Sequence, residues 1–417
     1  MKMIDQISGK KYSYFVNALL FVFPIVINLV KVAGDLVLVL LALAGIFIAI
    51  SHKISPFSIK DLKLFSWITL GYFLLVCVSI LFSGKALELA HYASRELAFL
   101  FAPFIGLAIY KAKAEMRYLL LGLKVGLIVV GIIIINQYLS GAGRPTGSMC
   151  FVSCHTMNAE EFGNVNVVLM FLAVSRFFDE GAWSRVLTLI ALSIGGVTMV
   201  LNATRGAWLV FLALLIICAV LIYKRYFLRS YKAKIAILVA VFVIVAGLGS
   251  TQIIQDRTNS AINGVIEWSN GDNVVSSAGL RLEMWKTSIG LLDELPLTGY
   301  GYRNTNEIVA KYAHDDAKKA ISSFNHLHND YLNHLIAMGF LGLVSVLVLL
   351  LLPLKLFITP FKLGHLSPNS IMGVFLCLSY SIVGLTTVVF GGVIMNALYV
   401  LLMAILMPVA IKESHPS

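Results

Sequence analysis

Long runs of apolar residues alternate with short polar segments along most of this chain. A run of about twenty apolar residues is long enough to cross the hydrocarbon core of a bilayer as a helix. The pattern therefore predicts an all-α, polytopic membrane protein with about twelve transmembrane helices. We expect these helices at residues 14–30, 35–51, 64–83, 96–110, 118–137, 164–178, 184–201, 207–223, 234–250, 332–353, 370–390 and 392–411.

Composition agrees with this pattern. Hydrophobic residues fill 59% of the 417 positions and charged residues only 13%, whereas a soluble domain carries about 25% charged residues. The formal net charge is +11. Its lysines and arginines lie mostly in short loops between apolar runs, where such residues set membrane orientation. Nucleic acid is therefore not an expected partner.

The distribution of Lys and Arg predicts which side each loop occupies. If the N-terminus is cytoplasmic, that side carries 19 of these residues, and the short loops opposite carry five. Seven more lie in one long loop, and long loops cross the membrane largely regardless of charge. Lys124 is left over, close enough to the start of its helix for its side chain to snorkel toward water. Both termini are therefore expected to be cytoplasmic.

The orientation places the longest polar stretch outside the cytoplasm. Residues 1–249 would hold helices one to nine, residues 250–331 a large loop, and residues 332–417 the last three helices. A loop of this length without structure is uncommon unless it is functional. Within it, Gly279–Leu292 has the apolar spacing of a short amphipathic helix, with Leu280, Met284, Ile289 and Leu292 as its apolar residues. Pro296 and Gly299-Tyr300-Gly301 predict a turn after that helix.

A smaller polar segment, residues 138–163, falls on the same side. It contains Arg144, Cys150, Cys154, His155 and the adjacent pair Glu160 and Glu161. The two cysteines are in a compartment where a disulfide can persist, and whether they form one stays open. The acidic pair is interpreted as a solvated cap on the sixth helix.

Two arginines on this outer side are candidates for phosphate binding. Arg205 stands between two apolar runs without an acidic neighbour, beside Gly206, which permits close backbone approach. An interfacial anchor is the alternative, because Arg and Trp208 both favour the headgroup level. Arg281 could equally be a solvated residue near Glu283. An unpaired arginine is nevertheless suited to bidentate phosphate binding.

The segment Phe324–Leu332 precedes the tenth helix and contains His326 and His328. His328 would lie at the helix N-terminus, with Asn329 or Asp330 as the cap. The positive end of the helix dipole favours a neutral imidazole, which can accept a proton as a general base. Metal binding by His326, His328 and His334 is the alternative. Their spacing does not place three ligands on one helical face, so no metal is expected.

At these residues the chain resembles the O-antigen ligase family of Gram-negative bacteria. The matching residues are Thr204-Arg205-Gly206-Ala207-Trp208, Arg281 with Trp285, Leu295-Pro296-Leu297-Thr298-Gly299-Tyr300-Gly301 and His328-Asn329-Asp330-Tyr331-Leu332. The resemblance implies a multi-pass inner-membrane glycosyltransferase with a periplasmic active site. It also implies that Arg205 and Arg281 bind pyrophosphate and that His328 is catalytic, with His326, Arg144 and Arg303 as secondary candidates.

The implied reaction moves a polysaccharide from undecaprenyl pyrophosphate to a sugar hydroxyl of lipid A–core, with inversion and without a cofactor. The expected partners are thus the lipid-linked glycan, the lipid A–core acceptor and membrane lipid. An O-antigen polymerase or a protein O-oligosaccharyltransferase would share fold and donor, and both remain alternatives. A secondary transporter is an alternative of another class, although transporters usually place ionisable groups near mid-membrane.

Overall fold

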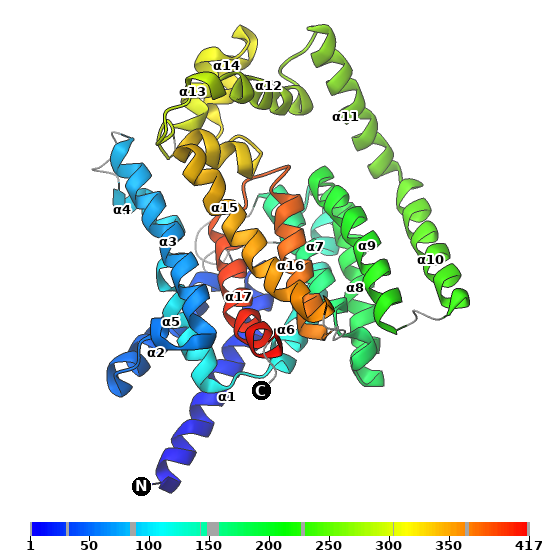
Figure 1. Cartoon of the computed structure of the whole chain (residues 1–417). Helices are drawn as coiled ribbons and strands as arrows, with labels where there is room; N and C mark the ends of the chain where they lie inside the picture. Colours follow the sequence, from blue (N-terminus) through cyan, green and yellow to red (C-terminus); the bar gives the residue numbers. More distant parts are fainter. Residues whose placement is uncertain are drawn as a thin grey trace.

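The computed structural model describes residues 2–30, 33–83, 89–141, 143–147, 158–226, 230–302, 304–362 and 367–414. All regular secondary structure in these ranges is helical, which confirms the predicted all-α membrane fold. The helices form a bundle with both chain ends at one end of it and α11–α14 at the other (Figure 1). We call the end with α11–α14 the loop face.

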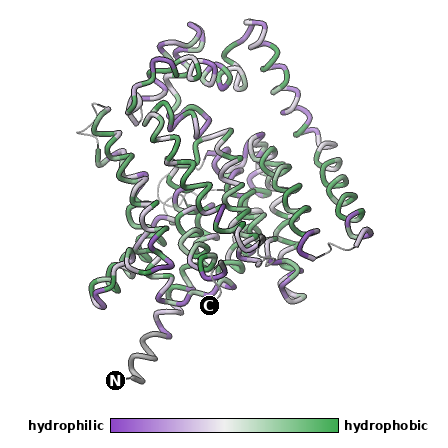
Figure 2. Tube along the Cα trace, viewed as in Figure 1, coloured by the Kyte–Doolittle hydropathy of each residue, from purple (hydrophilic) through white to green (hydrophobic). Residues whose placement is uncertain are grey.

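Ten apolar helical segments in the described ranges are long enough to cross a membrane. They are α2 (Ala33–His52), α3 (Lys60–Phe82), α4 with α5 (Leu89–Ala93 and Leu97–Ala112), α6 (Met116–Leu139), α7 (Ala159–Val174), α8 (Ala182–Asn202), α9 (Arg205–Tyr226), α10 (Tyr231–Gly249), α15 (Asp330–Lys362) and α17 (Val393–Ser414). The helices α1 (Lys2–Val26) and α16 (Pro368–Val383) occupy the two remaining predicted runs. Each of the twelve runs therefore contains a helix. Hydrophobic residues predominate through the bundle and give way to mixed polarity at the loop face (Figure 2).

The bundle is closely packed except at α10. A Cβ on Gly45 would lie 1.9 Å from the carbonyl oxygen of Phe104. The backbones of α2 and α5 can therefore approach each other this closely only because Gly45 has no side chain. In contrast, α10 buries none of its residues and exposes large apolar side chains such as Leu238 and Phe242. Such a helix, apolar and without buried residues, is suited to a lipid environment.

The long loop is mostly helical. It contains α11 (Gln252–Asn270), α12 (Ser277–Gly290), α13 (Thr305–Tyr312) and α14 (Asp315–Ser323). The predicted amphipathic helix is α12, and its residues Leu280 and Met284 are buried in a small core shared with α13 and α14. The prediction is wrong for Ile289 and Leu292, which are exposed, because the buried face continues through their neighbours Ser288 and Leu291 instead.

The predicted turn after α12 packs against a kink in α15. Gly339 interrupts α15 with φ 65° and ψ −160°, so carbonyl groups in the preceding turn lose their helical partners. The amides of Tyr300 and Gly301 donate to two of these carbonyls at 2.8 and 2.9 Å. Gly299 and Gly301 have φ values of 70° and 97°, which glycine adopts without strain. The turn thus fixes the start of α15 on the loop face.

Two sequence-based details are wrong. The run 370–390 is helical only to Val383, because residues 384–392 form a loop whose backbone binds Asp330. The amide of Asp330 donates to Gly384 at 2.7 Å, and the amide of Phe390 donates to the Asp330 carboxylate at 3.4 Å. Non-helical backbone is tolerated at membrane depth where protein groups satisfy it. Lys124 also does not snorkel: it is 1% exposed and donates to Glu180 at 2.5 Å.

Candidate functional site

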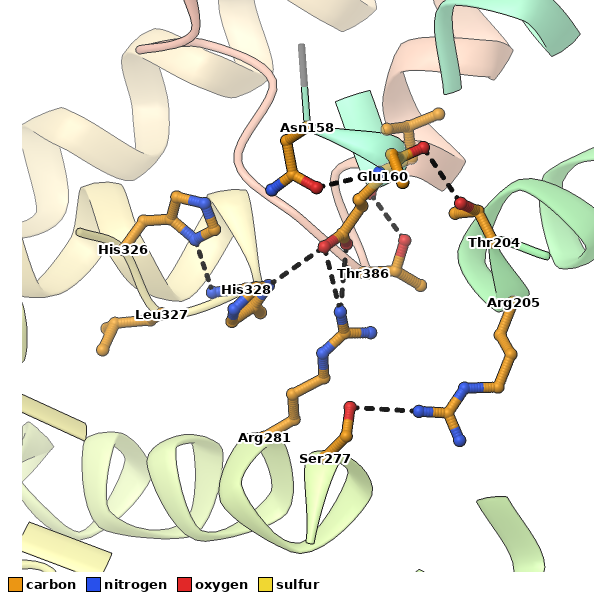
Figure 3. A network of polar contacts seen from close by, with 12 residues as sticks. Asn158, Glu160, Thr204, Arg205, Ser277, Arg281, His326, Leu327, His328 and Thr386 are labelled. Atoms are coloured by element: carbon orange, nitrogen blue, oxygen red, sulfur yellow. Dashed lines mark hydrogen bonds and ion pairs between the residues drawn. The ribbon is translucent and has the colours of Figure 1, made fainter. Parts of the chain in front are cut away.

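The candidate residues converge on the loop face, where the starts of α7, α9 and α15 meet α12. Figure 3 shows Glu160, Arg205, Arg281 and His328 around this junction. Asn158 caps α7 by accepting a hydrogen bond from the Glu160 amide at 3.1 Å, which fixes the first turn of the helix. The fold thus brings Glu160, Arg205, Arg281 and His328, which are distant in sequence, to one site.

Glu160 is the central residue of this site. Both of its carboxylate oxygens lie 3.1 Å from one guanidinium nitrogen of Arg281, and one oxygen lies 3.7 Å from Nδ1 of His328. Its side chain is only 15% exposed. The interpretation of Glu160 as a solvated cap is therefore wrong, because Asn158 caps the helix and frees the carboxylate to contact Arg281 and His328.

Arg281 is paired, contrary to the expectation of a free guanidinium group. Its partner is Glu160 rather than the sequence neighbour Glu283. The Glu283 carboxylate instead accepts hydrogen bonds from Trp268 Nε1 and from the His314 amide, both at 3.0 Å. Arg281 thus points from α12 toward α7, into the site.

Arg205 begins α9, two residues after the left-handed residue Ala203 (φ 55°). Its Nη2 donates to Ser277 Oγ at 3.0 Å, and no carboxylate of the described residues lies within ion-pair distance. Ser277 is one turn before Arg281 on α12, so both guanidinium groups lie along one face of that helix. Trp208 is buried and donates to the Met199 carbonyl, so it is not an interfacial anchor.

Two further arginines belong to this group. Arg144 donates to Thr204 Oγ1 at 3.2 Å, and burial followed by the charge of Arg257 lowers the pKa of Arg144 below its usual value. Arg205 is likewise close enough to Arg144, Arg257 and Arg281 for their like charges to act on it. We call these four arginines the cationic cluster. Sequence reasoning missed Arg257, which lies on the amphipathic helix α11 outside every quoted motif.

His328 lies just before α15 and is 9% exposed. Asn329 caps the helix by accepting from the Leu332 amide at 3.0 Å, as predicted. The backbone of His328 is left-handed, with φ 50°. His326 lies beside it, with ring centroids 4.5 Å apart, and its Nδ1 accepts from the His328 amide at 3.3 Å.

The third histidine of the metal alternative belongs to another network. His334 is fully buried, with Nδ1 at 2.8 Å from the Asp330 carbonyl and Nε2 at 3.0 Å from the Tyr72 hydroxyl. Both ring nitrogens therefore have protein partners, and His334 cannot complete a site with His326 and His328. Within the described ranges, no three His, Cys, Asp or Glu side chains gather as metal ligands.

A cavity of about 370 Å³ adjoins Glu160 on the loop face. Its walls include the charged residues Arg95, Glu160 and Glu161 and the polar residues Asn158, Asn164, Asn325 and His326. Arg205, Arg281 and His328 do not line it. The cationic cluster and the cavity therefore meet at Glu160. Arg303, Cys150, Cys154 and His155, named from the sequence, lie outside the described residues.

These features define a polytopic membrane protein with a cationic site and an adjacent histidine on its loop face. A protein-family model described as O-antigen ligase matches residues 189–347, which include Arg205, Arg281 and His328. The match over this part of the chain supports the O-antigen ligase family, whose members are membrane enzymes that transfer glycans.

A protein of Haemophilus influenzae is similar to nearly the whole chain. It is 23% identical over 377 residues, which cover 88% of this chain and 90% of that protein. It is described as uncharacterized. The family match supports glycan transfer in lipopolysaccharide-type biosynthesis.

Proposed function

We propose that this protein is an O-antigen ligase of the bacterial inner membrane. It transfers a polysaccharide from undecaprenyl pyrophosphate to a sugar hydroxyl of lipid A–core at the periplasmic face. The observation that carries the proposal is the contact of Glu160 with both Arg281 and His328, because it joins a phosphate-binding group to a proton acceptor. Cytoplasmic termini would place this site in the periplasm, since both ends lie opposite the loop face.

The cationic cluster binds the diphosphate of the donor. The four guanidinium groups of the cluster outnumber the Glu160 carboxylate that pairs with Arg281, so the site attracts an anion. Arg205 has no carboxylate partner among the described residues and is available for bidentate phosphate contacts. Neutralising the charge that develops on the departing diphosphate lowers the barrier to its release, and fixed guanidinium groups supply this without reorganisation.

His328 acts as the general base. Its Nε2 takes the proton of the acceptor hydroxyl while that oxygen bonds to the anomeric carbon of the donor sugar. The bond from that carbon to the phosphate oxygen breaks, and undecaprenyl pyrophosphate leaves with the electron pair. One direct displacement inverts the anomeric configuration. Glu160 faces Nδ1 and favours the tautomer with its proton on Nδ1, and such contacts are often long before substrate binds.

Reconstitution tests the proposal directly. Purified protein in lipid nanodiscs is given lipid-linked O-polysaccharide and lipid A–core, with and without a chelator and without any ion gradient. His328→Asn preserves the left-handed backbone, which Asn tolerates, and should lower the transfer rate about 10²–10⁴-fold. His91→Asn, an exposed histidine of α4, is the matched control and should transfer normally. Full activity of the His328→Asn variant would remove this histidine from the mechanism.

A deletion strain identifies the acceptor. Loss of a ligase leaves lipid-linked polymer accumulated and lipid A–core without polymer. A core capped with one repeat unit would instead indicate an O-antigen polymerase, and loss of glycan from proteins alone would indicate a protein O-oligosaccharyltransferase. Either of these results contradicts the proposed acceptor. Transfer by nanodiscs without a gradient excludes a transporter.

A further inference from the structure

Asn164 is a buried amide with no hydrogen-bond partner in the described structure. It lies on α7, one turn after Glu160, and is 1% exposed. Neither its Oδ1 nor its Nδ2 has a partner, and the residue lines the cavity beside Glu160. The great majority of buried polar side-chain atoms in proteins are hydrogen-bonded. An amide with both groups vacant at a cavity wall therefore points to a ligand.

The cavity has the chemistry of a site for a neutral sugar. Besides Asn164, its walls carry the amides of Asn158 and Asn325 and the hydroxyl-bearing residues Thr305 and Thr387. An amide both donates and accepts, as a sugar hydroxyl does, so the two are complementary. The volume of about 370 Å³ falls within the range of small-molecule sites, about 300–1,000 Å³.

The distribution of charge separates this cavity from the diphosphate site. None of the four arginines of the cationic cluster lines it; its charged walls are Arg95, Glu160 and Glu161. Because the two carboxylates outnumber the one guanidinium group, the cavity disfavours an anion, and the diphosphate of the donor is not the expected occupant. Because Glu160 also contacts His328, a sugar in this cavity lies next to the proposed base.

We infer that the cavity is the acceptor subsite: it binds a neutral sugar residue of the acceptor glycan, with Asn164 hydrogen-bonding one hydroxyl while a neighbouring hydroxyl faces His328. This inference rests on the proposed function, since it names the place of the acceptor in the same reaction. It makes Asn164 a specificity-determining residue that contacts the acceptor and not the donor.

The test variant is Asn164→Leu, which keeps the side-chain size and removes both polar atoms. The acceptor probe is lipid A–core glycan stripped of its acyl chains. We expect its KM to rise about 10-fold or more, because the bound hydroxyl loses its hydrogen bonds inside the cavity. The donor KM should stay unchanged. Without acceptor, the melting temperature should stay equal or rise, because the leucine leaves no unsatisfied amide. A purely structural asparagine would give a lower melting temperature.

The matched control is Ser379→Ala on α16. Its hydroxyl is also buried without a partner, but Ser379 does not line the cavity, so both KM values should stay unchanged. If the leucine variant does not insert, Thr387→Val on the cavity wall tests the same expectation.

The two proposals fail in different ways. No transfer by the wild-type protein would contradict the proposed function. Wild-type transfer together with an unchanged acceptor KM in Asn164→Leu would overturn the acceptor subsite alone. A rise in the donor KM alone would also overturn it, because the cavity would then hold the donor sugar.

Discussion

The neighbourhoods of His328 and His334 differ sharply although the two residues belong to one segment. His334 is fully buried, and its two ring nitrogens contact Asp330 and the Tyr72 hydroxyl. His328 lies at the junction of the cationic cluster and the cavity. Its Nδ1 faces Glu160 at 3.7 Å without forming a close hydrogen bond.

The difference distinguishes a histidine with structural contacts, His334, from the histidine proposed as the general base, His328. A ring with both nitrogens occupied by protein groups cannot exchange a proton with a substrate unless a buried contact breaks. A ring held on one side by a carboxylate, with its other nitrogen directed elsewhere, has the arrangement of an oriented general base. Burial and hydrogen bonding therefore favour a structural role for His334 and the proposed role of general base for His328, which residue type alone does not distinguish.

The His328 segment is also held by its neighbours. Trp285 Nε1 donates to the Leu327 carbonyl at 3.0 Å, and Asn306 Nδ2 donates to the His326 carbonyl at 3.2 Å. A non-glycine residue in a left-handed conformation costs on the order of 1–2 kcal/mol. These contacts offset that cost and preorganise the imidazole. They also give Trp285, matched only by motif in the sequence, a positioning role.

The largest expected effect lies in the His334 neighbourhood. His334 Nδ1 also lies 3.1 Å from the buried Asp330 carboxylate. His334→Leu removes this partner, and breaking a buried ion pair costs about 3–5 kcal/mol. We expect a marked fall in the melting temperature of the purified protein, while the folded fraction still transfers glycan. Tyr72→Phe removes one hydrogen bond and should cost only about 1 kcal/mol. A His334→Leu variant that is stable but inactive would reverse the assignment of the two histidines.

Glu160→Gln tests the neighbourhood of His328. Glutamine can still bond to Arg281, so the fold should be preserved, but the charge facing His328 is lost. In the proposed mechanism this contact tightens into a charge-assisted hydrogen bond when substrate binds. Losing about 1.5–3 kcal/mol there corresponds to a transfer rate about 10–100-fold lower. An unchanged transfer rate would reduce Glu160 to a structural partner of Arg281.

The fold was predictable because length and apolarity suffice to define membrane helices, yet helix ends were not. The run through residue 390 is apolar throughout, and nothing in it signals that Asp330, far away in sequence, binds the backbone of residues 384–392. Lys124 was misplaced for a similar reason. Its position near a helix end predicted an ammonium group that reaches water, whereas the ammonium group donates to Glu180 inside the protein.

Of the candidate site, only the residues that belong to recognisable sequence motifs were predictable. Arg205, Arg281 and His328 were named from motifs, and the structure brings Arg281 and His328 onto one carboxylate. Glu160 was set aside because acidic residues in the first turn of a helix are usually solvated. Its partner Arg281 is 121 residues away, a relation that a single sequence does not reveal.

Arg257 gives the smallest expected effect and the finest test of the cationic cluster. Arg257 acts on Arg144 and Arg205 through its charge. We therefore expect Arg257→Gln to raise the donor KM about 3-fold, which corresponds to roughly 0.6 kcal/mol. The effect should fade in about 1 M salt, where the Debye length falls to about 3 Å. Lys286→Gln on α12 carries the same charge change outside the cluster and should leave the donor KM unaltered. A lower kcat with an unchanged donor KM would instead show that Arg257 acts in the chemical step. The cationic cluster would then not be confined to donor binding, and the proposed separation of donor binding from proton transfer at His328 would be wrong.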